Sequence, residues 1–174
     1  MYKFAPASEN ESIVFGSSRP GYTNEQVNLW IEFMQAQNIQ RVCCLLTESQ
    51  LSRYSGLLYL YRKTFGINQI CWSPVKDFHL VTIQACTQQI LPFLRLADRC
   101  QEKVVVHCSG GMGRTGHVLT AWLVAGRGLS NKAAISAVRK TGRNPYEAVL
   151  AAPLRGRNPW RVTTDLSALL NACK

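Results

Sequence analysis

A chain of 174 residues, of which 47% are hydrophobic and 17% charged, has the size and composition of one ordered domain. We therefore expect a single domain over residues 1–174 and exclude an intrinsically disordered chain, because disordered chains are poor in apolar residues. The formal net charge of +10 favours anionic partners, such as phosphorylated substrates, without identifying one.

The first predicted element is an amphipathic helix over residues 24–37. Thr23 and Gln26 form a capping box at its start, and apolar residues then recur at helical spacing. The stretch that follows predicts, in chain order, a buried strand over 41–46, a short helix over 57–65 that ends at Gly66, and a weaker strand over 67–72.

A long helical pattern occupies residues 82–100. Its apolar positions recur every three or four residues, at Ile83, Cys86, Ile90, Leu94 and Ala97. Pro92 lies inside this pattern and has no backbone N–H to donate, and its ring crowds the preceding turn. We therefore predict a helix that is kinked or interrupted near Pro92.

The clearest strand pattern follows at residues 103–107, where three consecutive valines favour a buried strand. Three glycines, Gly110, Gly111 and Gly113, come next, and an apolar helical pattern then runs over residues 114–125. A strand, a glycine-rich loop and a helix in this order form an anion-binding site in many proteins.

The rest of the chain predicts three more helices: one that Ser130 caps and that ends at Gly142, one that starts at Asn144, Pro145 and Glu147, and one from Thr164 towards Cys173. We interpret the repeated Arg-Asn-Pro triplet, at 143–145 and 157–159, as a coincidence of turn residues. Because helices alternate with buried strands, we expect an α/β fold. Its central, mainly parallel sheet would have four to five strands, flanked by helices, with a phosphate loop between strand and helix.

The segment His107–Gly116 carries the candidate chemistry, with Cys108 at the end of a strand and Arg114 at the start of a helix. The backbone N–H groups available to surround a phosphate belong to Ser109, Gly110, Gly111, Met112, Gly113 and Arg114. The planar guanidinium of Arg114 adds two donors that match phosphate geometry. A buried cysteine or a glycine turn alone is usually structural, but so many constrained positions together favour a phosphate site.

The positive end of the following helix stabilises a negative charge on sulfur, so we expect Cys108 to react as a thiolate. A thiolate beneath a bound phosphate can attack phosphorus and form a phosphocysteine intermediate, which water then cleaves. Thr115 could donate a hydrogen bond to this thiolate and ease its departure in the second step. His107 could orient the loop through a hydrogen bond of its ring.

These residues are similar to the signature of the protein tyrosine and dual-specificity phosphatases, which reads His-Cys, five residues, Arg, then Ser or Thr and Gly. The resemblance extends beyond the loop. The segments Pro74–Phe78, Val104–Cys108 and Gly126–Glu147 resemble the small atypical dual-specificity phosphatases, and some similarity covers residues 39–148. The resemblance implies a metal-free and cofactor-free phosphatase.

The resemblance also implies a general acid on a mobile loop that precedes the nucleophile in the chain, and Asp77 fits this position. The chemistry requires such a group, because an alkoxide or phenoxide leaving group needs a proton as its bond to phosphorus breaks. Asp98 and Asp165 are the alternative carboxylates, but solvated or helix-capping roles explain them. Arg143 and Asn144 match a segment that borders the site in the small phosphatases, although helix capping explains Asn144 equally well.

The leading hypothesis is a dual-specificity phosphatase that acts on phosphotyrosine in a phosphorylated protein or peptide, with phosphoserine and phosphothreonine as further substrates. The sequence leaves the preference among these residues open. Two other hypotheses are a non-catalytic phosphate-binding module and an RNA 5′-phosphatase. A nucleic acid partner is less favoured, because only Tyr146 and Trp160 stand near the basic residues for base stacking. Inositol headgroups are also less favoured, because Ser109 and Met112 occupy loop positions at which phosphoinositide phosphatases tend to carry lysine.

The sequence also predicts a monomer in the cytoplasm without a membrane span, because neither a signal leader nor a long apolar run is present. The spacing of the seven cysteines indicates neither a disulfide framework nor a zinc site. Cys43 and Cys44 lie on a strand that could neighbour Cys108, so either could form a reversible disulfide with it. The alternative, two cysteines of the apolar core, is favoured.

Overall fold

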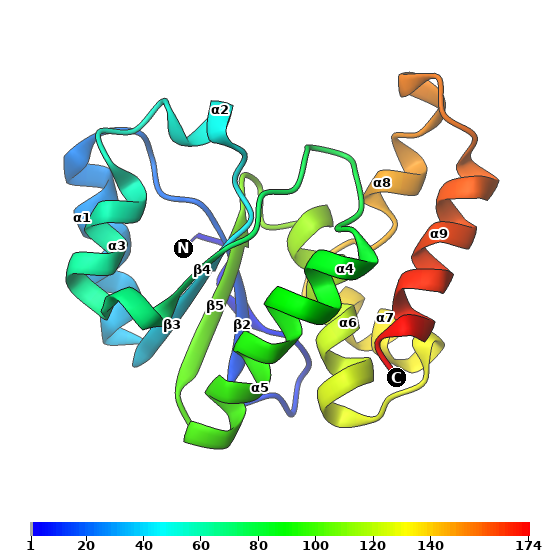
Figure 1. The fold of residues 1–174 in the computed structure, drawn as a ribbon, viewed down its shortest axis with the longest axis horizontal. Coiled ribbons are helices and arrows are strands. Elements are labelled where there is room, and N and C mark those ends of the chain that lie inside the picture. The colour runs from blue at the N-terminus through cyan, green and yellow to red at the C-terminus, as the bar shows by residue number, and fades with distance from the viewer. Residues whose placement is uncertain (1) are drawn as a thin grey trace.

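A five-stranded sheet forms the centre of the protein, as the computed structural model of residues 2–174 shows (Figure 1). The strands are β1 (Ala5–Pro6), β2 (Val14–Ser18), β3 (Ile39–Cys44), β4 (Ile70–Trp72) and β5 (Lys103–Cys108). Their order in the sheet is β1-β2-β5-β3-β4; β1 pairs antiparallel with β2, and β2, β5, β3 and β4 are parallel. The predicted α/β fold with a mainly parallel sheet is confirmed.

β5 lies in the middle of the sheet because its side chains are apolar on both faces. Val104–Val106 are fully buried, as expected for a parallel strand that is covered on both sides. Ser18 at the end of β2 lies opposite Cys108, and Cys44 at the end of β3 lies opposite His107. The carboxyl ends of three strands therefore meet at one edge, where parallel α/β sheets bind ligands.

Helices cover both faces of this sheet (Figure 1). One face carries α1 (Asn24–Ala36) and α3 (Leu57–Phe65). The other carries α4 (Ile83–Ala85), α5 (Leu91–Cys100) and α6 (Gly113–Arg127), with α7 (Asn131–Lys140), α8 (Glu147–Leu150) and α9 (Pro159–Ala172) packed against α6. The other short helical elements are α2 (Glu48–Leu51), the 3₁₀ turns η1 (Ile67–Gln69) and η3 (Pro153–Arg155), and the π-helical turn η2 (Cys86–Ile90). Over residues 2–174, no helix has the length and apolar character needed to cross a membrane.

The predicted capping box of α1 is present. The Thr23 hydroxyl accepts a hydrogen bond from the Gln26 backbone N–H at 3.2 Å, and the Gln26 side chain accepts one from the Thr23 N–H at 3.3 Å. The apolar residues at helical spacing, Val27, Trp30, Ile31 and Met34, are all buried against the sheet. Local chemistry therefore determines both the start of this helix and the face that packs.

The predicted interruption of the helical pattern at residues 82–100 is also confirmed. The π-helical turn η2 separates α4 from α5, and the Leu91 N–H donates to the Cys86 carbonyl, five residues back. Pro92 then lies in the first turn of α5, directly after this wider turn. The wider turn thus accommodates a proline that an uninterrupted α-helix would not tolerate.

Two predicted elements are shorter than expected, and two strands were not predicted. Residues 67–69 of the predicted strand form η1, so only β4 pairs with β3. The Asn144 side chain accepts a hydrogen bond from the Tyr146 N–H at 3.1 Å, but the helix begins only at Glu147 and has one turn. The sequence analysis predicted neither β1 nor β2. β1 has only two residues, and the segment VFGSS of β2 shows no clear alternation of apolar and polar residues.

The last helix, α9, starts at Pro159 rather than at the predicted Thr164. The Asn158 side chain accepts a hydrogen bond from the Trp160 N–H at 2.9 Å, and proline occupies the first helical position. This is a regular helix start. The predicted start at Thr164 was therefore wrong, because the Asn158 cap and Pro159 begin the helix five residues earlier.

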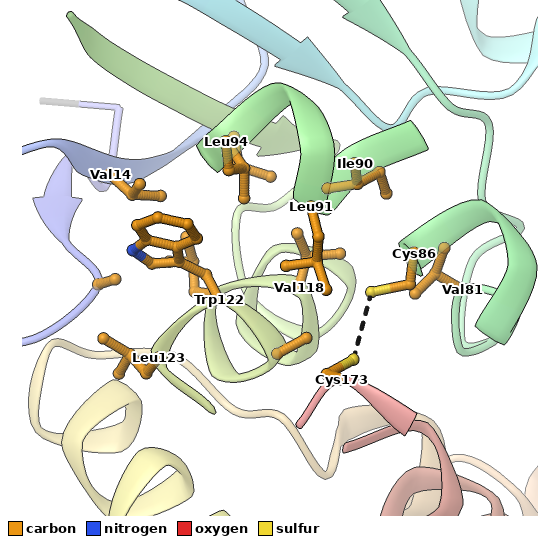
Figure 2. Packing of buried hydrophobic residues seen from close by; sticks show 14 of the residues in the cluster. Val14, Val81, Cys86, Ile90, Leu91, Leu94, Val118, Trp122, Leu123 and Cys173 are labelled. Carbon is orange, nitrogen blue, oxygen red and sulfur yellow. Dashed lines mark hydrogen bonds between the residues drawn. The ribbon is translucent and has the colours of Figure 1, made fainter. Parts of the chain in front are cut away.

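Apolar side chains of α5 and α6 fill the space between these helices and the sheet (Figure 2). The buried members drawn in Figure 2 include Val14, Ile90, Leu91, Leu94, Val118 and Trp122. Cys86 and Cys173 belong to the same core, with their sulfur atoms 3.9 Å apart, and connect η2 with the end of α9. This packing holds α6, the helix that begins beside Cys108, in a defined position.

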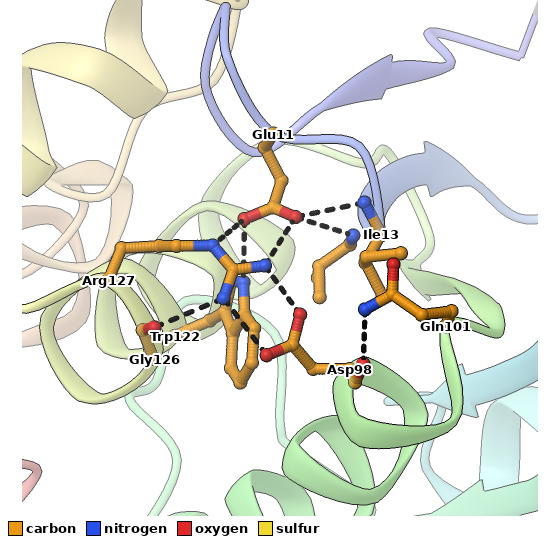
Figure 3. Close-up of polar contacts among 8 residues, drawn as sticks. Glu11, Ile13, Asp98, Gln101, Trp122, Gly126 and Arg127 are labelled. Atoms are coloured by element: carbon orange, nitrogen blue, oxygen red, sulfur yellow. Dashed lines mark hydrogen bonds and ion pairs between the residues drawn. The ribbon is translucent and has the colours of Figure 1, made fainter.

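A buried carboxylate joins the start of β2 to the end of α6 (Figure 3). The oxygens of Glu11 accept hydrogen bonds from the backbone N–H groups of Ile13 and Val14 and from the Trp122 indole, at 2.9, 3.2 and 3.0 Å. Arg127 donates two more bonds to Glu11, each at 3.0 Å, and also pairs with Asp98 at 2.7 Å. Glu11 is 5% exposed, so these donors replace the water it would otherwise need.

Candidate active site

The loop between β5 and α6 lies at the carboxyl edge of the sheet, the edge from which α2 follows β3 (Figure 1). Cys108 ends β5, Gly113 begins α6, and Ser109–Met112 connect them. Within residues 2–174, the N–H groups of Ser109–Met112 donate to no backbone carbonyl. The first N–H groups of a helix also lack intrahelical acceptors, and the dipole of α6 adds positive potential. The predicted anion-binding loop thus has its donors available.

Gly111 is the glycine that the loop requires most strictly. Its φ of +69° lies in the left-handed region, which side-chain-bearing residues rarely adopt. A Cβ at this position would stand 2.6 Å from backbone atoms of Ser17 and Ser18. The loop can therefore pack against the end of β2 only because residue 111 has no side chain.

Cys108 is buried beneath this loop, with 2% of its surface exposed. The Thr115 hydroxyl, in the first turn of α6, donates a hydrogen bond to the Cys108 sulfur at 3.2 Å. This is the contact that the sequence analysis expected of Thr115. A hydroxyl donor and a helix amino terminus at one sulfur atom both favour negative charge there.

Arg114 is 3% exposed and its guanidinium is held from several sides. Its Nη1 donates to the Val75 carbonyl at 2.9 Å and to the Gln50 side-chain oxygen at 3.0 Å. Its Nη2 forms an ion pair with Asp77. Arg114 and Cys108 therefore flank the same loop, as predicted.

Asp77 lies in the loop between β4 and α4, and its side chain is 47% exposed. Besides the ion pair with Arg114, it accepts a hydrogen bond from the Gln50 amide at 2.7 Å. The alternative carboxylates lie elsewhere: Asp98 pairs with Arg127 at the far end of α6, and Asp165 is exposed on α9. Of the three candidates, Asp77 is the one that contacts the phosphate-loop arginine.

The C-terminal segment supports the loop that carries Asp77. Phe78 has a φ of +61°, an uncommon value for a residue with a bulky side chain. Arg157 donates a hydrogen bond to the Phe78 carbonyl, and the Arg155 guanidinium lies 4.6 Å from the centre of the Phe78 ring. Strained backbone of this kind persists only where its surroundings hold it. No feature of the sequence indicated these contacts.

His117 of α6 connects the same loop to the helix. The Val81 backbone N–H donates to the His117 Nε2 at 3.0 Å, so this nitrogen is the unprotonated one. The imidazole is 1% exposed, and burial lowers the pKa of His117 to about 4. A neutral His117 is thus part of the framework of the Asp77 loop.

The orienting role of His107, through a hydrogen bond of its ring, stays a prediction. Its ring contacts the Cys108 backbone, and its Nε2 lies 3.4 Å from the Tyr61 hydroxyl. The ring packs edge-on against Trp30 and Tyr61, at centroid distances of 5.3 and 5.7 Å. Burial lowers the pKa of His107 to about 3. His107 therefore supports Cys108 from below as a neutral ring in an aromatic cluster.

Gln50 is a site residue that the sequence analysis missed. Its amide nitrogen also donates to the Ser109 hydroxyl at 3.0 Å, so one side chain contacts Asp77, Ser109 and Arg114. The signal that would have located its helix was present: Thr47 and Gln50 repeat the spacing of the capping box that starts α1, and Gln50 accepts from the Thr47 N–H at 3.2 Å.

Cys43 and Cys44 lie on β3, directly beside β5, as predicted. Both are fully buried. Burial raises the pKa of the Cys44 thiol to about 12, and contact with Cys71 together with burial raises the pKa of Cys43. Protonated, inaccessible thiols oxidise poorly, which favours the core interpretation. A reversible disulfide with Cys108 stays a prediction.

Arg143 and Asn144 border the loop. The Arg143 guanidinium is buried behind Gly16 and donates to the carbonyls of Thr141 and Lys3 at 2.9 and 2.7 Å. Burial lowers the pKa of Arg143 to about 10. Both residues line a surface cavity of about 590 Å³ beside Met112.

Within residues 2–174, no three His, Cys, Asp or Glu side chains are grouped to hold a metal ion.

Comparison with known proteins agrees with this geometry. Residues 22–148 match the family described as "Dual specificity phosphatase, catalytic domain". The chain belongs to this family. The resemblance inferred from the segment His107–Gly116 is thereby confirmed. A search of the curated proteins found no match to this chain.

Solved structures show the same dual-specificity phosphatase fold. Tk-PTP in its active form is 26% identical, over 92% of this chain and 96% of Tk-PTP, with a TM-score of 0.67. Kinase associated phosphatase, solved with serine in place of its catalytic site cysteine, is 22% identical over 83% of this chain and 88% of its own, with a TM-score of 0.64. PTPMT1 in complex with PI(5)P is 14% identical over 98% and 96%, with a TM-score of 0.69. At such identities, the last two likenesses concern the fold alone.

Proposed function

We propose that this dual-specificity phosphatase domain hydrolyses phosphomonoesters in two steps through Cys108. In the first step the Cys108 thiolate attacks phosphorus, the S–P bond forms, the P–O bond breaks, and Asp77 gives its proton to the leaving oxygen. In the second step water attacks phosphorus, Asp77 takes a proton from that water, and the S–P bond breaks. Inorganic phosphate leaves and the thiolate is restored.

The observation that carries this proposal is the convergence of three groups on one loop. Cys108 lies under it, Arg114 closes one side, and Asp77 contacts Arg114. Backbone N–H groups of Ser109–Gly113 and the Arg114 guanidinium would surround the phosphate oxygens and stabilise the charge that develops in the transition state. Thr115 would stabilise the departing thiolate through the hydrogen bond that it already makes.

We favour phosphorylated proteins or peptides as substrates. The cavity beside Met112 offers room for residues that flank a phosphorylated side chain, and Arg139 and Tyr146 connect it to a second cavity of about 710 Å³. Lys132 and Lys140 line that second cavity, so acidic flanking residues would fit. PTPMT1 was solved with PI(5)P, but Ser109 and Met112 supply no lysine for an inositol headgroup in this loop.

We further propose that the chain acts as one domain and as a monomer, since all of the proposed site residues come from one chain. We propose the cytoplasm as its compartment, because all seven cysteines are free and a thiolate nucleophile requires reducing surroundings. Size-exclusion chromatography with light scattering tests the monomer directly.

The decisive experiment measures hydrolysis of para-nitrophenyl phosphate in the presence of a chelator. We expect turnover by the wild type and none by Cys108→Ser, because a serine hydroxyl lacks the thiolate's charge at neutral pH. Cys100→Ser, which alters an exposed cysteine away from the loop, is the matched control and should keep full activity. Mass spectrometry after rapid acid quench should detect one phosphoryl group on Cys108. Activity of Cys108→Ser equal to wild type, or loss of turnover on chelation, would refute the mechanism.

A substrate panel separates the remaining alternatives. Phosphotyrosine and phosphoserine peptides, 5′-phosphorylated RNA and vesicles containing PI(5)P are compared by kcat/KM. The proposal expects the peptides to be the best substrates. Preference for RNA would support the 5′-phosphatase hypothesis, and phosphate binding without turnover of any substrate would support the non-catalytic module.

A further inference from the structure

The contacts of Gln50 divide its side chain into two functional halves. The amide nitrogen donates to the Asp77 carboxylate at 2.7 Å and to the Ser109 hydroxyl at 3.0 Å. The amide oxygen accepts from Arg114 at 3.0 Å and from the Thr47 N–H at 3.2 Å. Carboxylate oxygens only accept hydrogen bonds, and guanidinium nitrogens only donate them. The partners therefore determine the orientation of the amide.

Among the side chains of similar length, only an amide satisfies both halves. Glutamate would accept from Arg114 and Thr47 but would place a second negative charge beside Asp77, and methionine would make none of these bonds strongly. A glutamate does serve in a capping box, where only the acceptor half is needed. The donor half of Gln50 therefore serves the site, whereas the acceptor half also starts α2.

We infer that Gln50 is a positioning residue whose amide holds the Asp77 carboxyl group beside the Arg114 guanidinium, where the leaving oxygen of the substrate is protonated. This inference rests on the proposed function. Arg114 binds the phosphate and Asp77 acts on the oxygen that leaves it, so the two groups must keep a defined separation. The amide of Gln50 bridges them, and its bond to Ser109 anchors the bridge to the phosphate loop.

A positioning role predicts that the defect depends on the leaving group. Phenyl phosphate releases a basic phenoxide that needs the proton of Asp77, whereas para-nitrophenyl phosphate releases a stable anion that needs it less. Gln50→Met should lower kcat/KM for phenyl phosphate roughly tenfold to a hundredfold, the value of a hydrogen bond to a charged group. The loss for para-nitrophenyl phosphate should be smaller, and KM should change less than kcat, because the phosphate loop is intact.

Gln50→Glu separates this role from capping of α2. A purely structural role predicts that Gln50→Glu behaves like the wild type, because glutamate caps as well as glutamine. The positioning role predicts a larger loss of kcat for phenyl phosphate than Gln50→Met shows, and a raised KM because a second carboxylate competes for Arg114. The same changes at Gln26, whose capping box lies at the start of α1, are the matched controls and should leave both substrates unaffected.

Thermal unfolding confirms that each variant is folded. Wild-type kinetics of Gln50→Glu, or equal losses for both substrates, would overturn the inference. Failure of the proposed function is recognised separately, by activity of Cys108→Ser that equals the wild type.

Discussion

The Asp77 carboxylate and the Arg114 guanidinium form an ion pair across the phosphate loop. One of the two is the proposed proton donor and the other is the proposed phosphate clamp, so a phosphate that enters the loop must compete with Asp77 for the same donors. Because the Asp77 side chain is 47% exposed, the pair is weak enough to exchange. This relationship leads to a prediction in which turnover and phosphate affinity change in opposite directions.

Asp77→Asn should lower kcat and at the same time strengthen the binding of inorganic phosphate. The loss of general acid catalysis should cost roughly a hundredfold to ten-thousandfold in kcat. Release of Arg114 from its partner should lower the inhibition constant of phosphate by up to about fivefold, the value of a partly exposed ion pair. Steady-state kinetics with phosphate as competitive inhibitor measure both, and Asp165→Asn, on the exposed face of α9, is the control. Unchanged kcat in Asp77→Asn would exclude its assignment.

Thr115→Ala should slow the second step more than the first. Without the hydroxyl, the departing thiolate loses a hydrogen bond that forms at 3.2 Å in the structure. Hydrogen bonds to charged groups contribute about 1.5–3 kcal/mol, so hydrolysis of the phosphocysteine should slow roughly tenfold to a hundredfold. Rapid-quench experiments should show a burst of product and accumulated intermediate, and Thr115→Ser should restore wild-type behaviour. A slower first step without accumulation would contradict the role.

Gly111→Ala should destabilise the protein and Gly110→Ala should not. A methyl group at residue 111 would meet the backbone of Ser17 and Ser18 at 2.6 Å and would require a φ of +69°. The cost of such a conformation is about 1–3 kcal/mol before the steric clash is added. At residue 110 no atom lies within 4 Å of the added methyl group, so we expect a change within about 0.5 kcal/mol. Urea unfolding of both variants at neutral pH compares them; equal stabilities would show that the loop backbone adapts.

The buried histidines should make stability fall as pH decreases from about 6.5 towards 4. Burial lowers the pKa of His117 to about 4, whereas an unfolded chain binds this proton near pH 6.5. In this window the unfolded state holds more protons, so each pH unit of acidification costs about 1.4 kcal/mol for this one group. Below about pH 4 the folded state is protonated too, and the contribution levels off.

Comparison of the wild type with His117→Gln isolates this effect. The variant has no group to titrate at this position, and its side-chain oxygen can still accept from the Val81 N–H. Urea unfolding at pH 7, 6 and 5 should show a shallower decline for His117→Gln than for the wild type. Parallel declines would show that the pKa of His117 in the folded protein equals its pKa in the unfolded chain.

Contiguous residues were sufficient to predict the phosphate loop. The segment His107–Gly116 contains the strand end, the glycines and the helix start, and these interactions are local. The capping box at Thr23 and Gln26 and the interruption near Pro92 were predictable for the same reason. The start of α9 was predicted five residues too late although the capping chemistry of Asn158 and Pro159 is equally local, so that error came from the interpretation.

The tertiary structure alone decided which distant groups meet this loop. The resemblance favoured Asp77 over Asp98 and Asp165, but its contact depends on the fold. The order of β3, β4 and β5 in the sheet places Asp77 against Arg114, whereas Asp98 faces Arg127. Gln50 enters because the parallel arrangement of β3 and β5 places α2 at the same edge as the loop.

The surroundings of His107 were also not predictable from nearby residues. Its burial among aromatic rings depends on α1 and α3 packing on one face of the sheet. Helix starts and anion loops depend on backbone groups a few residues apart, so the amino-acid order of this protein determines them. The meeting of an acid, an arginine and an amide depends on strand order and helix packing, which arise from contacts between segments far apart in the chain.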